Sequence, residues 1–223
     1  MSQIDQKGKI QTVLGLIDPK DLGLTMTHEH LLIDFSVMFN PTPDVTTQRM
    51  AHTPVSMENL GWIRQYCYSN LDNLLVLDEE TAIEEAMLYQ RHGGGAIVDA
   101  TTIGIGRDPL ALARISRGAG VHVVMGAGYY VDAAQPNEIN NKNEDDIYQE
   151  IIKDVQLGVG NTGIKAGIIG EIGCTWPLMP NEIKVLKASA RAQLETGLSI
   201  LIHPGRDEKA PIEILRILAD SGA

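Results

Sequence analysis

The segment Leu22–Leu32, with the sequence LGLTMTHEHLL, is an apolar run that ends in imidazole and carboxylate side chains. Further short apolar runs follow it along the chain: Ala96–Ala100 (AIVDA), Val121–Ala127 (VHVVMGA), Ala166–Ile172 (AGIIGEI) and Leu198–Ile202 (LSILI). Such near-continuous apolar strands are typical of a parallel sheet whose two faces are both covered. We therefore expect these segments to be parallel core strands, with the polar residues of Leu22–Leu32 at the carboxyl end of the first.

Helical patterns alternate with these strands. Asp78 is a predicted N-cap, and the apolar side chains after it recur at the spacing of one helix face until Gly93–Gly95. Asp108 followed by Pro109 predicts another helix start, because proline is favoured at the first helical position. Further helices are expected from Met57 (capped by Ser56), over Glu144–Leu157, from Pro180 to Gly197 and over Pro211–Ala219. Strands or a hairpin are expected over Gly8–Leu16, and a functional loop or lid over Ser36–Pro54.

This alternation indicates an α/β protein of one domain, residues 1–223, because a chain of 223 residues suffices for a single sizeable core. The β/α units form either an open doubly wound sheet or part of a closed barrel. The alternation of strands and helices alone does not distinguish the two. In both architectures ligands bind at the carboxyl ends of the strands. The polar residues at those ends are therefore the candidates for function.

The composition argues against several classes of function. The formal net charge of −11 disfavours nucleic acid and anionic membrane surfaces as partners, because both attract clustered Lys and Arg. No apolar run approaches the ~18 residues of a membrane helix, and residues 1–7 (MSQIDQK) lack the apolar stretch of a secretory leader. Two cysteines, Cys67 and Cys174, cannot make a disulfide framework, so a reducing, cytoplasmic location is expected.

The first candidate site residues are His28 and His30, in the sequence Thr27-His28-Glu29-His30. Side chains alternate along a strand, so the two imidazoles share one side while Glu29 points to the other. Two imidazoles on one side, a residue apart, suit a divalent metal ion. A pair of core histidines with backbone partners is the alternative.

Glu171 lies within the run Ala166–Ile172, and His203 directly follows the run Leu198–Ile202. A lone carboxylate in so apolar a strand is costly to bury unless a cation or a basic side chain pairs with it. A salt bridge is the alternative for Glu171, and a structural role is the alternative for His203. Together with the histidine pair, these residues predict a metal centre in which two ions share a carboxylate and activate a water molecule.

Two other patterns are weaker. Cys174 could be a nucleophile, but no histidine is placed by the sequence to activate it, so a buried thiol is expected. The glycines in Ile103–Gly106 resemble a phosphate-binding loop only loosely. They lack its spacing and its lysine, and a tight turn into the cap at Asp108 explains them better.

Several segments together resemble the phosphotriesterase family of the amidohydrolase superfamily, and the resemblance covers nearly all of the chain. They are THEHLLIDF (Thr27–Phe35), VDATTIGIGRDP (Val98–Pro109), VHVVMGAGYYVDA (Val121–Ala133), GIIGEIGCTWPL (Gly167–Leu178) and IHPGRDEKAP (Ile202–Pro211). The resemblance implies a TIM-type (β/α)8 barrel with two divalent metal ions, usually zinc.

In this family the histidine pair of the first strand holds the more buried ion, and His28 and His30 match that pair. The bridging ligand is a carboxylated lysine in some members and a glutamate in a related branch, which Glu171 matches. The histidine of the fifth strand, matched by His203, serves the more exposed ion. The resemblance thus implies metal binding by all four residues and a catalytic role for Glu171 and His203.

The implied activity is metal-dependent hydrolysis of small esters, lactones or amides, including N-acyl amino acids such as N-acetyltaurine, by metal-bound hydroxide. Phosphotriester hydrolysis is one alternative, and a truncated non-catalytic protein or pseudoenzyme is another. Arg206, three residues after His203, is expected to bind an anionic substrate group, or else to be a surface arginine or to form a salt bridge within its loop. Tyr129, Tyr130 and Trp176 follow strands three and four, where they either line a pocket or pack.

Successive strands begin about 34 residues apart, so an eight-stranded barrel needs about another hundred residues. The strand-six histidine and strand-eight aspartate of the family have no counterpart in this sequence. We therefore expect an incomplete barrel of about five β/α units, and expect the isolated chain to be poorly soluble or partly unfolded, and hydrolytically silent. The expected partner is a small-molecule substrate, and a homodimer is possible.

Overall fold

A parallel five-stranded sheet forms the centre of this computed structural model, which describes residues 7–223. Its strands are β3 (Leu24–Glu29), β6 (Gly94–Asp99), β7 (His122–Ala127), β8 (Ile168–Gly173) and β9 (Ile200–His203), side by side in this order. Each core strand therefore pairs with the next one in the chain, as in part of a barrel, whereas the strand order of a doubly wound sheet reverses. The expected strands are confirmed, with their ends shifted by a few residues.

The first six residues lie outside the described part of the chain, so the structure does not test the expectation that concerns a secretory leader. Within residues 7–223, no helix is long and apolar enough to cross a membrane.

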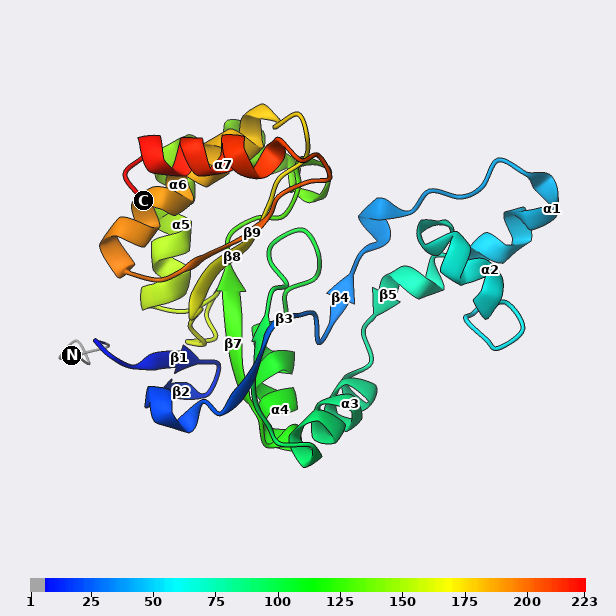
Figure 1. Cartoon of the computed structure of the whole chain (residues 1–223), viewed down its shortest axis with the longest axis horizontal. Helices are drawn as coiled ribbons and strands as arrows, with labels where there is room; N and C mark the ends of the chain where they lie inside the picture. Colours follow the sequence, from blue (N-terminus) through cyan, green and yellow to red (C-terminus); the bar gives the residue numbers. More distant parts are fainter. Residues whose placement is uncertain (1–6) are drawn as a thin grey trace.

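Helices connect the strands and pack against them and against one another (Figure 1). They are α3 (Glu79–Arg91), α4 (Pro109–Ala119), α5 (Glu144–Gln156), α6 (Pro180–Thr196) and α7 (Ala210–Asp220). Two predicted caps are confirmed, because the side chain of Asp78 accepts from the backbone N–H of Thr81 and that of Asp108 from Ala111. Helix α6 ends at Gly197, whose φ of 71° is the left-handed conformation that favours glycine.

One predicted helix start is wrong. The helix expected from Met57 is α2 (Leu60–Gln65), which begins further along the chain. The buried side chain of Asn59 accepts a hydrogen bond from the backbone N–H of Ser56 (2.8 Å) and donates one to the carbonyl oxygen of Pro54 (2.8 Å). These two hydrogen bonds hold the residues between them in a turn, so that the helix starts after Asn59.

A projecting segment, residues 36–74, separates β4 (Ile33–Asp34) from β5 (Leu75–Val76), which pair antiparallel. The loop expected over Ser36–Pro54 forms its first part and contains short helical turns, including α1 (Val45–Gln48). In Figure 1 the projecting segment extends away from the central sheet. Its residue Tyr68 nevertheless lies beside Phe35, with ring centroids 6.2 Å apart, and reaches the carboxyl ends of the strands.

The two ends of the sheet have different surroundings. A hairpin of β1 (Ile10–Thr12) and β2 (Gly15–Ile17), expected over Gly8–Leu16, lies at the amino end of β7. There the backbone N–H of Val13 donates to the carbonyl oxygen of Val123 (2.8 Å). The opposite ends of the strands carry polar side chains beneath a cavity, and the candidate site is at that end.

Candidate metal centre

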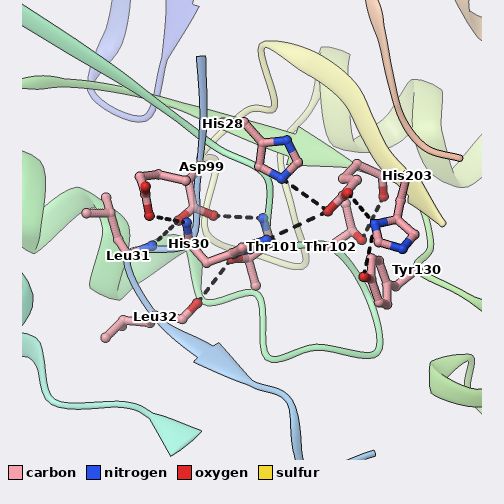
Figure 2. A network of polar contacts seen from close by, with 11 residues as sticks. His28, His30, Leu31, Leu32, Asp99, Thr101, Thr102, Tyr130 and His203 are labelled. Atoms are coloured by element: carbon pink, nitrogen blue, oxygen red, sulfur yellow. Dashed lines mark hydrogen bonds and ion pairs between the residues drawn. The ribbon is translucent and has the colours of Figure 1, made fainter. Parts of the chain in front are cut away.

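Four residues predicted from the sequence meet at the carboxyl ends of three strands. His28 lies in β3 with His30 directly after it, Glu171 lies in β8, and His203 is the last residue of β9. Nitrogen atoms of the three imidazoles, which Figure 2 shows, lie 2.9–3.7 Å from the carboxylate oxygens of Glu171. Glu171 is 2% exposed, so its charge is costly to bury without cationic or hydrogen-bonding partners.

Two of the histidines surround one oxygen of this carboxylate at the spacing of metal ligands. Nε2 of His28 lies 3.4 Å from Oε2 of Glu171, and Nε2 of His30 lies 3.7 Å from it. Atoms that bind a tetrahedral ion at roughly 2.0–2.1 Å lie about 3.3–3.4 Å from one another. The ligand atoms of all three residues lie within 4.8 Å of one another. The three residues therefore fit one divalent cation.

The surroundings of His30 favour the neutral imidazole that binds a metal ion. Burial lowers the pKa of His30, while the negative charge of Glu171 opposes that effect. A neutral imidazole is the form that binds a metal ion. The rings of His28 and His30 stand edge to face with their centroids 5.5 Å apart, so each keeps one nitrogen directed toward Glu171.

His203 contacts the other oxygen of the carboxylate. Its Nδ1 lies 2.9 Å from Oε1 of Glu171 and 3.3 Å from the hydroxyl of Tyr130. The shorter distance is that of a hydrogen bond and is less than the spacing of two ligands on one ion. Among the described residues, the group whose ligand atoms all lie within 4.8 Å of one another contains His28, His30 and Glu171 but not His203. A second ion between Glu171 and His203 would require their atoms to move slightly apart.

Sequence analysis missed a buried carboxylate that holds these ligands in place. Asp99, at the end of β6, is fully buried and accepts hydrogen bonds from the backbone N–H groups of Leu31 (2.8 Å) and Thr101 (3.1 Å). Burial raises the pKa of Asp99 to about 7, although these hydrogen bonds lower it. The signal was present, because Asp99 lies in the apolar run Ala96–Ala100 just as Glu171 lies in its own run.

A cavity of about 730 Å³ opens over the histidines. Its walls include Phe35, Met38, Tyr68, Tyr130, Trp176 and Arg206. Its volume is that of a small-molecule site. The exposed guanidinium of Arg206 donates a hydrogen bond to the hydroxyl of Tyr68 (3.2 Å), a residue that sequence analysis did not single out. The structure thus brings Tyr130 and Trp176 to the cavity, where the sequence had allowed either a pocket wall or packing, and it brings Arg206 there as well.

Tyr129 lies outside this cavity. Its side chain is 1% exposed, and its hydroxyl donates to Glu150 and accepts from Lys142 (3.0 Å). Burial raises the pKa of Tyr129 to about 12. Since successive side chains after β7 point to opposite sides, Tyr130 faces the cavity while Tyr129 packs in the core.

A further buried carboxylate, Glu182 in the first turn of α6, joins two walls of the cavity. Its oxygens accept hydrogen bonds from the backbone N–H groups of Asp132 (3.0 Å), Thr175 (3.0 Å) and Met179 (2.9 Å), and from the hydroxyl of Thr175 (2.9 Å). Asp132 lies in the loop after β7 and Thr175 in the loop after β8. Glu182 therefore fixes both loops. Its sequence position had no distinguishing signal, because acidic residues are common in the first turn of a helix.

The two weaker sequence patterns are structural. Cys174 is 1% exposed, and burial raises its pKa to about 12, so it is a buried thiol as expected. Gly106 has a φ of 91°, and a Cβ atom there would lie 2.9 Å from the backbone nitrogen of Asp34. This glycine serves a tight turn before α4, in agreement with the sequence interpretation.

The fold and the site together define a class of protein. Parallel strands in sequential order, with imidazole and carboxylate groups at their carboxyl ends beneath a cavity, are typical of (β/α)-barrel enzymes. The sequence profile of the Phosphotriesterase family matches residues 8–223. The chain belongs to the phosphotriesterase family.

Named relatives share much of this sequence. The chain is 45% identical over 217 residues to N-acetyltaurine hydrolase of Homo sapiens, covering 97% of this chain and 62% of that protein. It is 46% identical over 218 residues to phosphotriesterase-related protein of Nematostella vectensis, covering 96% of this chain and 62% of that protein. The chain thus spans 62% of the length of these relatives.

Solved structures agree with the fold. A resiniferatoxin-binding protein from Rhodobacter sphaeroides superposes with a TM-score of 0.96 at 38% identity, covering 100% of this chain and 63% of that one. The phosphotriesterase homology protein from Escherichia coli, solved with phosphate in its active site, has a TM-score of 0.72 at 26% identity, covering 91% of this chain and 60% of that one. These likenesses confirm that the described strands form part of a TIM-type barrel.

Proposed function

We propose that this chain carries the metal-binding part of a hydrolase that uses a divalent cation, with zinc as the expected ion, to cleave small amides or esters. The observation that carries the proposal is the group of His28, His30 and Glu171, whose ligand atoms lie within 4.8 Å of one another beneath a cavity. Membership of the phosphotriesterase family supports it. The relatives named N-acetyltaurine hydrolase support N-acyl amino acids as the substrate class.

The residues around the ion have distinct roles. When bound, the ion would polarise the substrate carbonyl and lower the pKa of a water molecule. His28, His30 and Oε2 of Glu171 would hold it. Glu171 and His203, whose Oε1 and Nδ1 atoms lie 2.9 Å apart, would serve a second ion.

Arg206 is proposed to bind the anionic end of the substrate. A guanidinium presents several donors in one plane, a geometry that matches a carboxylate or sulfonate. Arg206 lies at the cavity wall of a chain whose formal net charge of −11 would otherwise disfavour an anion. The walls at Tyr130 and Trp176 provide apolar surface for the rest of the molecule. An N-acyl amino acid combines a cleavable amide with such an anionic end.

Phosphotriester hydrolysis is the second candidate. The Escherichia coli structure with phosphate in its active site favours it, because that protein shares the fold. A phosphotriester has no negative charge, however, and so would not use the charge of Arg206. This difference makes the N-acyl amino acid the better match to the cavity.

The test uses the protein that carries this sequence, expressed in full and loaded with zinc. We expect hydrolysis of N-acetyltaurine that is lost on treatment with a chelator and restored by zinc, with metal content followed by elemental analysis. Turnover of a paraoxon-like triester is measured beside it, and a preference for the triester would favour the second candidate. A protein that binds no divalent cation would overturn the proposal.

A further inference from the structure

The segment directly after β6 contributes no predicted ligand, yet it contacts two of the three strands that do, β3 and β8. The backbone N–H of Ala100 donates to the carbonyl oxygen of Glu29 (2.8 Å), and the backbone N–H of Glu171 donates to the carbonyl oxygen of Ala100 (3.3 Å). The hydroxyl of Thr102 donates to the carbonyl oxygen of Glu171 (3.1 Å). The hydroxyl of Thr101 lies 3.0 Å from Nδ1 of His30. Figure 2 shows Thr101 beside His30 and Leu32.

The hydrogen bonds of Thr101 determine which nitrogen of His30 bears the proton. A hydroxyl donates one hydrogen, and the hydroxyl of Thr101 lies 3.1 Å from the carbonyl oxygen of Leu32, which can only accept. Thr101 is 1% exposed, so water offers no ready substitute as a partner. Both contacts are satisfied when Thr101 donates to Leu32 and the Nδ1–H of His30 donates to Thr101. The lone pair of the imidazole is then on Nε2, the nitrogen that faces Glu171 at 3.7 Å.

We propose that Thr101 is a positioning residue for the metal site, which holds His30 in the tautomer whose Nε2 lone pair is directed at the cation. The opposite tautomer would leave either the carbonyl oxygen of Leu32 or Nδ1 of His30 without a hydrogen-bond donor, at the cost of a buried unsatisfied group. It would also direct an N–H at the place of the cation. Partners of this kind raise metal affinity because they fix the tautomer and the ring orientation before the ion arrives.

The position of the hydroxyl is itself fixed by Asp99. The carboxylate of Asp99 accepts from the backbone N–H of Thr101 and from that of Leu31, the residue after His30. The turn that carries His30 and the residue that contacts its ring are thus held by one buried group. Thr101 therefore acts on His30 from a fixed position just after the neighbouring strand β6.

The affinity test compares three variants of the protein that carries this sequence. Zinc dissociation constants are measured by competition with a chromophoric chelator for Thr101→Val, Thr101→Ser and Thr12→Val. Thr12 is a matched control, since it is also buried and its hydroxyl donates to a carbonyl oxygen, that of Gly15 (2.8 Å), but in the hairpin at the other end of the sheet. We expect about a 10–100-fold loss of affinity for Thr101→Val, recovery in Thr101→Ser, and no change for Thr12→Val.

A second measurement reads the tautomer directly and needs no substitution at Thr101. Nitrogen NMR of the metal-free protein, with the His30 signals assigned by their loss in His30→Asn, should show Nδ1 protonated and Nε2 unprotonated. A proton on Nε2, or unchanged zinc affinity in a folded Thr101→Val protein, would overturn the role of Thr101. This inference rests on the proposed metal site. Failure of the unsubstituted protein to bind zinc would overturn that proposal, while the tautomer of His30 would still decide the role of Thr101.

Discussion

Nδ1 of His203 lies 2.9 Å from Oε1 of Glu171, on the opposite oxygen of the carboxylate from the one that His28 and His30 face. His28 lies in β3 and His203 in β9, which are the two edge strands of the central sheet. One buried carboxylate on β8 therefore connects side chains from both edges. The geometry of the whole group depends on Glu171 more than on any of the histidines.

Replacing this carboxylate tests the metal site. Glu171→Gln preserves the shape of the side chain but removes its charge, so we expect zinc affinity to fall by more than the roughly 100-fold that loss of an outer partner causes. Competition with a chelator measures the change. Glu213→Gln, on the outer helix α7, is the matched control and should bind zinc as the unsubstituted protein does. Equal affinities in the two variants would contradict a ligand role for Glu171.

Glu182→Gln should destabilise the protein by about 2–3 kcal/mol, because an amide N–H would then face the N–H donors that the carboxylate accepts. Unfolding in urea, followed by circular dichroism, measures the free energy of unfolding. Glu138→Gln is a suitable control, since Glu138 is exposed and its substitution should change that free energy by less than about 0.5 kcal/mol. If both variants unfold at the same urea concentration, Glu182 does not hold the two loops as inferred.

Arg206→Lys should raise KM for an anionic N-acyl substrate by about tenfold, since lysine cannot make the paired, planar hydrogen bonds of a guanidinium. The KM for a neutral ester should change little. Steady-state kinetics on the two substrates gives the comparison, with Arg216→Lys on the surface of α7 as the control. Equal losses on both substrates would instead indicate that Arg206 has a structural role, through its hydrogen bond to Tyr68.

The two cysteines should differ sharply in reactivity. Only the thiolate reacts with iodoacetamide, and with a pKa of about 12 the thiol of Cys174 is ionised in roughly one molecule in a thousand at pH 9. Cys67 is exposed and provides the internal reference. Mass spectrometry should find Cys67 modified at pH 7 and pH 9, and Cys174 modified only after unfolding in guanidinium. Modification of Cys174 in the folded protein would show that its surroundings open to solvent.

The sequence predicted the strands and the cluster of four site residues because local patterns carry both. An apolar run predicts a buried strand wherever its partners lie, and alternation along a strand predicts that His28 and His30 share a side. The cap at Asp78 is equally local, since its side chain bonds to Thr81 within the same helix.

Other features depend on segments that are distant in the sequence and could not be predicted in this way. Thr101 contacts His30, which lies 71 residues away, and Glu182 contacts Asp132, which lies 50 residues away. These contacts exist only after the strands and loops have packed. The predicted helix start at Met57 was wrong for a related reason. The buried side-chain amide of Asn59 bonds to Ser56, the expected cap, and to Pro54. Neither pattern nor propensity contains such information.

The projecting segment, residues 36–74, provides a wall of the cavity that is independent of the strands that carry the predicted ligands. Met38 and Tyr68 reach the cavity from this segment, whereas His28 and Glu171 belong to the sheet. Substrate preference can therefore change through insertions, deletions or substitutions in the projecting segment, while the candidate metal ligands on the strands stay the same. A library of variants confined to residues 36–74 would leave the candidate metal ligands unchanged, and exchanging this segment between relatives should transfer substrate preference with it.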